Sequence, residues 1–392
     1  MKSYLKYLIK KRFPVYLSAF VIFLILFFSI NNVANMLNEV KIDGGKTYIV
    51  SRWIFLVYII SFAIALGVIV PFEFAFKMKN ITANQAYSLP IKREKLYLTK
   101  FIFGFLEIVV PFTLAYGISV VTLLPIHPYV NMLGFLMFYG LLIVIGLLFY
   151  SFEVFIYCQA NNVVDGIIFI ALASILPFAV AFVVLFDITG TSSATYPFNP
   201  SYFCPEYSFS IADDIAKCVL YHNHVYGVTT RWDGTTLVYM SVSYEFKITA
   251  QYIVIICFFV ALGIASFIGQ FFASKNFKSE DAGQRSESWF GYKLYIPIVI
   301  ISFSHIIGNA SVVFYFICLI SAYLLYVLYK RSFKLNKKTW IILACVLTGA
   351  TVAYVVGFTS QDIIRHNYYN KRYGNYYYTE VLFNSISNRM LA

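Results

Sequence analysis

The sequence predicts an all-α, polytopic membrane protein with about nine transmembrane helices, and three observations lead to this fold class. Of its 392 residues, 60% are apolar and 12% are charged, and the mean hydropathy is +0.74. Soluble domains average about 45–50% and about 25% for the same two classes. The apolar residues gather in runs of about 17–25, the length of a membrane-crossing helix, and Lys and Arg stand between the runs. A soluble enzyme and a disordered chain are excluded, because a soluble fold of this length lacks the interior for so much apolar surface.

The apolar runs predict the spans in order. Residues 2–12 place Lys on one helix face and Leu and Ile on another, which predicts a helix in the membrane interface before the first span. The run Leu294–Tyr329 is too long for one straight span and is broken by Gly308 and Asn309, so we expect two short spans there. The other runs each predict one span: Phe13–Ile30, Trp53–Phe76, Phe101–Leu124, Met132–Tyr157, Gly166–Phe186, Tyr252–Phe272 and Trp340–Phe358.

Basic residues orient the predicted spans. The N-terminus and the loops 77–100, 273–293 and 330–338 carry 20 of the 30 Lys and Arg residues. With nine spans these four segments face the same side, and the positive-inside rule places that side, with the N-terminus, in the cytoplasm of a plasma-membrane protein. The same rule accounts for the formal net charge of +12. We expect no nucleic-acid partner, because no recognition module accompanies the charge.

The predicted spans also define a domain organisation. Cys204 and Cys218 share a small external segment between spans five and six, residues 187–250. A disulfide that closes a loop of about 15 residues and two unpaired thiols both fit this spacing. The three parts of the chain are a six-span core with its coupling region 77–100 and external segment (1–272), three additional spans (273–358) and an external tail (359–392).

Three acidic residues lie within the proposed spans, toward their inner ends: Glu73, Glu107 and Glu153. A charge inside the membrane is costly, so it indicates a function by default. Two interpretations stay open. The carboxylates pair with nearby basic residues, or they line the inner vestibule of a transport path.

The sequence offers no catalytic constellation. Gly45-Lys46-Thr47 is similar to the end of a phosphate-binding loop, but Val40 stands where that loop requires its first glycine. No Ser/His/Asp, Cys/His or metal-ligand pattern is present. We therefore expect no enzymatic activity, no cofactor and no metal site in this chain.

The stretch Lys77–Phe103 combines a short-helix pattern with basic residues. Thr82 is placed to cap a short helix, and Pro90 to start a second helix that runs toward the third span. Ile91 and Leu96 supply apolar contacts, while the Lys and Arg residues around them stay near the anionic inner surface of the membrane. A short helix on this face is a surface on which a soluble partner can push.

This stretch resembles the coupling region of type 2 ABC exporter permeases, in which a Leu-Pro is followed by basic residues, a Leu and a Lys before span three. Here these residues are Leu89-Pro90-Ile91-Lys92-Arg93-Glu94-Lys95-Leu96 and Lys100. The resemblance covers about residues 1–272, includes the turn Cys158–Asn162, and is nearest to Gram-positive permeases linked to acetoin use and cell-wall antibiotic response. Only 34 residues follow Phe358, so we do not expect the external C-terminal domain of some members.

The resemblance implies a membrane subunit of an ATP-driven exporter. Separate ABC ATPase subunits would dock at residues 77–100 and near 158–165, and a second permease subunit, identical or not, would complete the path through the lipid bilayer. Two alternatives stay open: an ATP-independent transporter or channel, and a membrane sensor or immunity protein that binds a peptide through residues 187–250. The residues implied to contact the ATPase are Tyr87, Leu89, Pro90, Ile91, Lys92, Arg93, Glu94 and Leu96.

Overall fold

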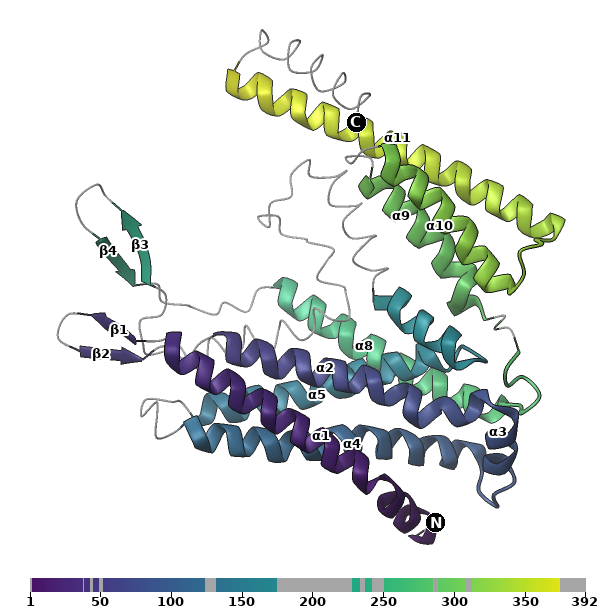
Figure 1. The fold of residues 1–392 in the computed structure, drawn as a ribbon, viewed down its shortest axis with the longest axis horizontal. Coiled ribbons are helices and arrows are strands. Elements are labelled where there is room, and N and C mark those ends of the chain that lie inside the picture. Colours follow the sequence, from purple (N-terminus) through teal and green to yellow (C-terminus); the bar gives the residue numbers. More distant parts are fainter. Residues whose placement is uncertain are drawn as a thin grey trace. The chain divides into compact units, whose positions relative to one another are not determined.

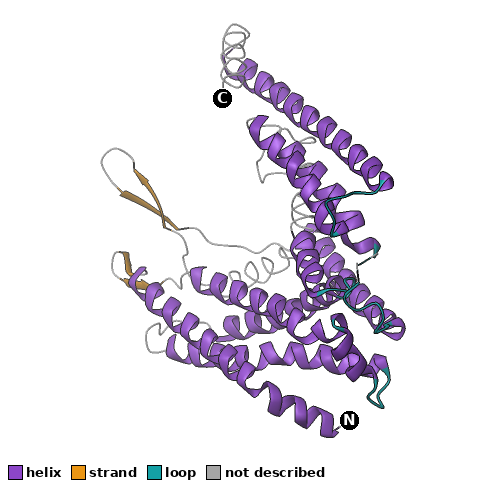
Figure 2. Ribbon diagram, turned by 45° about the vertical axis from the view of Figure 1, so that its right-hand side comes forward, coloured by secondary structure: helices purple, strands orange, loops and turns teal. Residues whose placement is uncertain are grey.

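The described part of the chain is built almost entirely of α-helices (Figure 1). Figure 2 shows that the strands among the described residues are confined to two short hairpins. The computed structural model describes residues 2–37, 39–42, 45–48, 52–123, 132–174, 228–232, 237–241, 250–284, 286, 288–307 and 312–373.

Seven helices in these ranges are long and apolar enough to cross a membrane. The prediction of a multi-span helical membrane protein is therefore confirmed. The seven are α1 (Lys2–Leu37), α2 (Arg52–Phe74), α4 (Arg93–Leu123), α5 (Met132–Tyr157), α8 (Ala250–Ala273), α10 (Val312–Lys330) and α11 (Lys337–Tyr373). Shorter helical elements are 3-10 turns at Ala75–Met78 and Ser274–Asn276, α3 (Asn80–Tyr87), the helix Val163–Ser174, a π-helical turn at Trp289–Lys293 and α9 (Leu294–Ile307).

One of the two compact units of the chain comprises Met1–Phe76, Ile81–Phe155 and Glu206–Ser279. In this unit α1 packs along α4, and α2 contacts both helices. Buried aromatic rings fill these contacts. The ring centroids of Phe27 and Tyr58 lie 4.5 Å apart, and Phe112 contacts a further ring of α2. Edge-to-face and tilted ring pairs stabilise a core beyond their buried area, so part of the 20% aromatic content is core packing.

The second compact unit comprises Lys77–Asn80, Ile156–Pro205 and Glu280–Ala392. Its helices α9, α10 and α11 contact one another pairwise. Where α11 crosses α9, Gly357 faces the backbone carbonyl of His305, and a β-carbon at this glycine would collide with that oxygen. A glycine inside a membrane helix is expected at such a close backbone approach.

The helix ends differ from the expected spans. Residues 2–12 are helical as expected, but the helix continues past Pro14 into the first span without a break. In the run 294–329 the described residues form α9 and α10, and the predicted break at Gly308 and Asn309 lies outside the described residues. Helix α11 continues well beyond Phe358, to Tyr373. Of the fifth expected span, the described residues are helical to Ser174, and 175–186 lie outside the described residues.

Two antiparallel hairpins, which the all-α prediction did not include, lie in segments expected to be loops. Strand β1 (Glu39–Ile42) pairs with β2 (Gly45–Tyr48), with Glu39 opposite Tyr48. Gly45-Lys46-Thr47 is therefore part of a strand and does not lead into a helix as a phosphate-binding loop would. Strand β3 (Val228–Trp232) pairs with β4 (Leu237–Ser241). Cys204 and Cys218 lie outside the described residues.

Candidate functional site

The first candidate site is the elbow between α2 and α4, which we define as residues 75–96. Helix α3 follows α2 through the 3-10 turn Ala75–Met78. The Thr82 hydroxyl donates a hydrogen bond to the carbonyl oxygen of Phe76, 2.8 Å away. Thr82 was predicted to cap α3. Instead it joins the first turn of α3 to the 3-10 turn Ala75–Met78, and the next residue, Ala83, is fully buried.

The outer side of α3 is open. Ile81 is 75% exposed, and Asn84, Gln85 and Ser88 are exposed with it. Residues three, four and seven apart lie on one face of a helix, so these four side chains form one surface with an apolar residue at its start. Ile81 was not among the residues predicted for this site, although it is the one Ile in the predominantly polar α3 and lies opposite the buried Ala83.

The turn from α3 into α4 corrects the predicted helix start. Pro90 was expected in the first turn of the second helix, but α4 begins at Arg93. The amide of Ile91 donates to the carbonyl oxygen of Leu89, 2.7 Å away. This tight turn reverses the chain around Pro90, so helical geometry begins only after Lys92, whose carbonyl accepts from the amide of Leu96.

Several of the residues implied to contact an ATPase make contacts inside the chain. The guanidinium of Arg93 lies 5.0 Å from the ring centre of Tyr87 and donates to the carbonyl oxygen of Phe277. Glu94 pairs with Lys275 at 3.6 Å, and both side chains are partly exposed. Leu96 is only 2% exposed, so its side chain belongs to the core of this unit. Lys92 and Pro90 are exposed, whereas Leu89 and Ile91 are half-buried.

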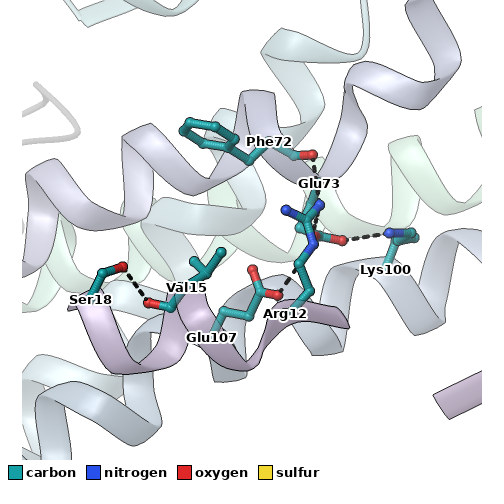
Figure 3. Close-up of polar contacts among 7 residues, drawn as sticks. All are labelled: Arg12, Val15, Ser18, Phe72, Glu73, Lys100 and Glu107. Carbon is teal, nitrogen blue, oxygen red and sulfur yellow. Dashed lines mark hydrogen bonds and ion pairs between the residues drawn. The ribbon is translucent and has the colours of Figure 1, made fainter. Parts of the chain in front are cut away.

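The second candidate site is a buried ion cluster, defined by Arg12, Glu73, Lys100 and Glu107 (Figure 3). Glu73 accepts from Lys100 at 2.8 Å and pairs with Arg12 at 2.7 Å, one partner on each carboxylate oxygen. The Nε of Arg12 lies 3.7 Å from Glu107. Both carboxylate side chains have no exposed surface, and the two positive and two negative charges balance. Figure 3 also shows the Arg12 guanidinium donating to the Phe72 carbonyl, at 3.2 Å.

The local sequence makes room for this cluster. A β-carbon at Gly104 would lie 3.0 Å from the Cγ of Glu73 and would collide with the Tyr150 hydroxyl. Any larger residue there would therefore press on Tyr150 first and then on Glu73. Arg12 was read only as a basic residue that orients the first span. Its partner lies 61 positions away, at residue 73, and no local pattern reports such a contact.

Glu153 is also buried, on α5, with its carboxylate against Gly67 of α2, where a β-carbon would lie 3.1 Å from one carboxylate oxygen. Thus Glu73 and Glu107 share Arg12 as a partner, in line with the pairing interpretation. A vestibule lined by the three glutamates stays a prediction. Among the described residues, no group of three or more His, Cys, Asp or Glu side chains could hold a metal ion.

The third candidate site is the turn after α5, residues 158–162. The Lys77 ammonium donates to the carbonyl oxygen of Cys158. Burial raises the pKa of the Cys158 thiol to about 11, although Lys77 opposes the shift. The thiol is therefore protonated at neutral pH, and a protonated buried thiol is a poor nucleophile. This turn is a structural joint with no reactive cysteine.

Comparisons with known proteins add no family to this description. No protein-family model matches the chain, and neither a curated protein nor a solved structure matches it. The apolar helices and their packing show a helical protein with several candidate membrane spans.

Proposed function

We propose that the chain is the membrane-spanning permease subunit of an ATP-driven ABC transporter that acts as an exporter in the plasma membrane. Separate ATPase subunits bind the chain on its cytoplasmic face, and a second permease subunit completes the path. The chain itself carries no catalytic activity in this proposal. The observation that carries it is the elbow, a short helix with one open face between two long membrane helices.

The elbow has the properties that a force-transmitting element needs. Its inner side is fixed by the buried Ala83 and by the Thr82 hydrogen bond to the 3-10 turn that follows α2, and its other end leads into α4 through a five-residue turn. A displacement of α3 therefore reaches two long helices directly. Its open face offers Ile81 as an apolar anchor, with the exposed Lys92 and Lys95 nearby in the chain. An acidic-rimmed apolar groove on the ATPase would complement this surface.

The proposal includes nine spans with the N-terminus in the cytoplasm. Seven helices have the length of a span, and the helix Val163–Ser174 and α9 supply the start of one span and a short second one. With nine crossings, the elbow, the loop 273–293 and the loop 330–338 share the cytoplasmic side with the N-terminus. That arrangement satisfies the positive-inside rule.

The test is capture of the ATPase at the elbow in the native membrane. A photo-crosslinking amino acid at position 81 should capture a nucleotide-hydrolysing subunit, and the same amino acid at position 333 should not. Phe333 is the matched control, because it is 76% exposed and lies in another basic loop. Lys92→Glu should weaken co-purification of the ATPase, whereas Lys334→Glu should not. Transport driven by an ion gradient without ATP, or a position 81 that labels only from the outer surface, would overturn the proposal.

A further inference from the structure

The turn after α5 is covered by residues more than 100 positions further along the chain, all within the second compact unit. The carbonyl oxygen of Gln159 accepts from the Ser286 hydroxyl at 2.7 Å, and its side-chain oxygen accepts from Ser288 at 2.8 Å. The carbonyl of Asn161 accepts from the amide of Gly283 at 2.7 Å. Gly283, Ser286 and Ser288 thus occupy three polar groups of this turn.

Asp165, three residues after the turn, adds contacts to Tyr292 and Arg331. It lies in the first turn of the helix Val163–Ser174, and its side chain is 8% exposed. The Tyr292 hydroxyl donates to one carboxylate oxygen at 2.9 Å, and Arg331 contacts the other at 3.1 Å. Burial and the Asp165 charge raise the pKa of Tyr292, so its hydroxyl keeps the proton that it donates.

Arg331 occupies a backbone conformation that an arginine rarely adopts. It follows the last residue of α10 with a φ of 52°, the left-handed cap position where glycine is preferred. The amide of Ser332 donates to the carbonyl of Val327 across this cap. The guanidinium of Arg331 contacts Asp165 and also donates to the carbonyl oxygen of Gly283, 3.2 Å away. An arginine at a position that favours glycine indicates that the contacts of its side chain offset the backbone strain.

We propose that these contacts form a clamp, defined by Gln159, Asp165, Gly283, Tyr292 and Arg331, that makes the helices α9–α11 move together with the turn after α5. This inference rests on the proposed function, extended by the expectation from the sequence that an ATPase subunit also docks near residues 158–165. The push then reaches α10 through the Asp165–Arg331 pair and α9 through Tyr292, which directly precedes it. In this proposal the helices α9–α11 move during transport, because the clamp transmits the displacement of the turn after α5 to them.

The variant that tests the clamp is Arg331→Gly. Glycine adopts the left-handed conformation without strain, so this variant removes the clamp and keeps the cap of α10. Lys334→Gly is the matched control, because it removes a neighbouring exposed basic side chain outside the clamp. Spin labels at positions 164 and 333, placed through a genetically encoded reactive amino acid, report the distance across the clamp. Val164 and Phe333 are 60% and 76% exposed, so labels there leave the core undisturbed.

In the full chain without ATPase, the parent and Lys334→Gly should each give one narrow distance distribution. Arg331→Gly should broaden it by several ångströms. An unchanged width in Arg331→Gly overturns the clamp, whether or not an ATPase ever binds.

In the complex with ATPase, the parent distance should stay constant between ATP-bound and nucleotide-free states. Arg331→Gly should let it change and should lower transport several-fold at normal ATPase binding. A parent distance that changes with nucleotide overturns the joint movement. Failure of an ATPase to bind the parent chain counts against the proposed function, and the measurement without ATPase still decides the clamp.

Discussion

The ion cluster and the clamp are both built from an arginine and a carboxylate, but they differ in exposure. In the ion cluster the side chains of Glu73 and Glu107 have no exposed surface and that of Arg12 is 22% exposed. In the clamp the Arg331 side chain is 42% exposed. Breaking a buried pair leaves an uncompensated charge and costs about 3–5 kcal/mol, whereas exposed pairs contribute about 0–1 kcal/mol. The first arrangement therefore contributes strongly to holding α1, α2 and α4 together, and the Asp165–Arg331 pair of the clamp contributes less to stability.

The largest effect should come from Glu73→Gln. This change removes the carboxylate that contacts both Lys100 and Arg12, so Lys100 loses its 2.8 Å ion pair at a buried place, and Arg12 keeps only the 3.7 Å contact with Glu107. We expect the free energy of unfolding to fall by about 3–5 kcal/mol. Denaturant unfolding in detergent micelles, followed by tryptophan fluorescence, measures it. A loss under about 1 kcal/mol would show that the pair is solvated like a surface pair.

Asp165→Asn should have an intermediate effect. The amide keeps the shape and can still accept from Tyr292, but the charge that attracts Arg331 is lost. Because Arg331 can turn toward water, we expect a loss of about 1–2 kcal/mol. A double-mutant cycle with Arg331→Gln separates the pair from its surroundings. Additive single losses would contradict a direct interaction.

The clamp should also give a pH dependence at the alkaline end. Folding favours the protonated phenol of Tyr292, because its pKa is raised in the folded chain. This contribution to stability is complete below the ordinary tyrosine pKa of about 10 and is lost as the pH rises above it. Tyr292→Phe should therefore differ from the parent in unfolding free energy up to pH 10 or so, with the difference shrinking above. If the difference in unfolding free energy between the parent and Tyr292→Phe grows above that pH, the pKa of Tyr292 is not raised in the folded chain.

Glu107→Gln should change stability little. Arg12 keeps Glu73 as its nearer partner, and the variant no longer has to bury a second carboxylate charge. We expect a change within about 1 kcal/mol of the parent in either direction. If transport falls while the unfolding free energy is unchanged, the vestibule prediction for Glu107 gains support. A loss as large as that of Glu73→Gln would mean that the four charges act as one unit.

The smallest effect should come from Glu94→Gln. The pair with Lys275 is 3.6 Å long, and its two side chains are 34% and 46% exposed. We expect a loss below about 0.5 kcal/mol, and it should vanish at high salt. The measurement is the same unfolding titration at low and high salt. A salt-independent loss would indicate that this pair is buried when the chain is in the membrane.

The sequence could predict the helices because hydropathy and length decide which runs can cross a membrane. It could also place Glu73 near the end of its helix, whereas Glu107, expected toward an inner end, lies in the middle of α4. It could not identify Arg12 as their partner, because that contact joins helices far apart in the chain. The predicted start of α4 was wrong because the chain first makes a tight turn around Pro90. That turn is closed by a single backbone hydrogen bond, which the sequence pattern does not reveal. A glycine would have signalled the left-handed cap of α10, and the sequence has Arg331 there.

Helix α11 is 37 residues long, and its apolar part ends at Thr359. The remaining turns to Tyr373 extend the rod by about 20 Å at 1.5 Å per residue. Such an arm magnifies rotation, since a tilt of about 10° swings its tip by roughly 4 Å over that length. A fluorophore near the tip would thus convert small rocking of the last span into a readable optical signal.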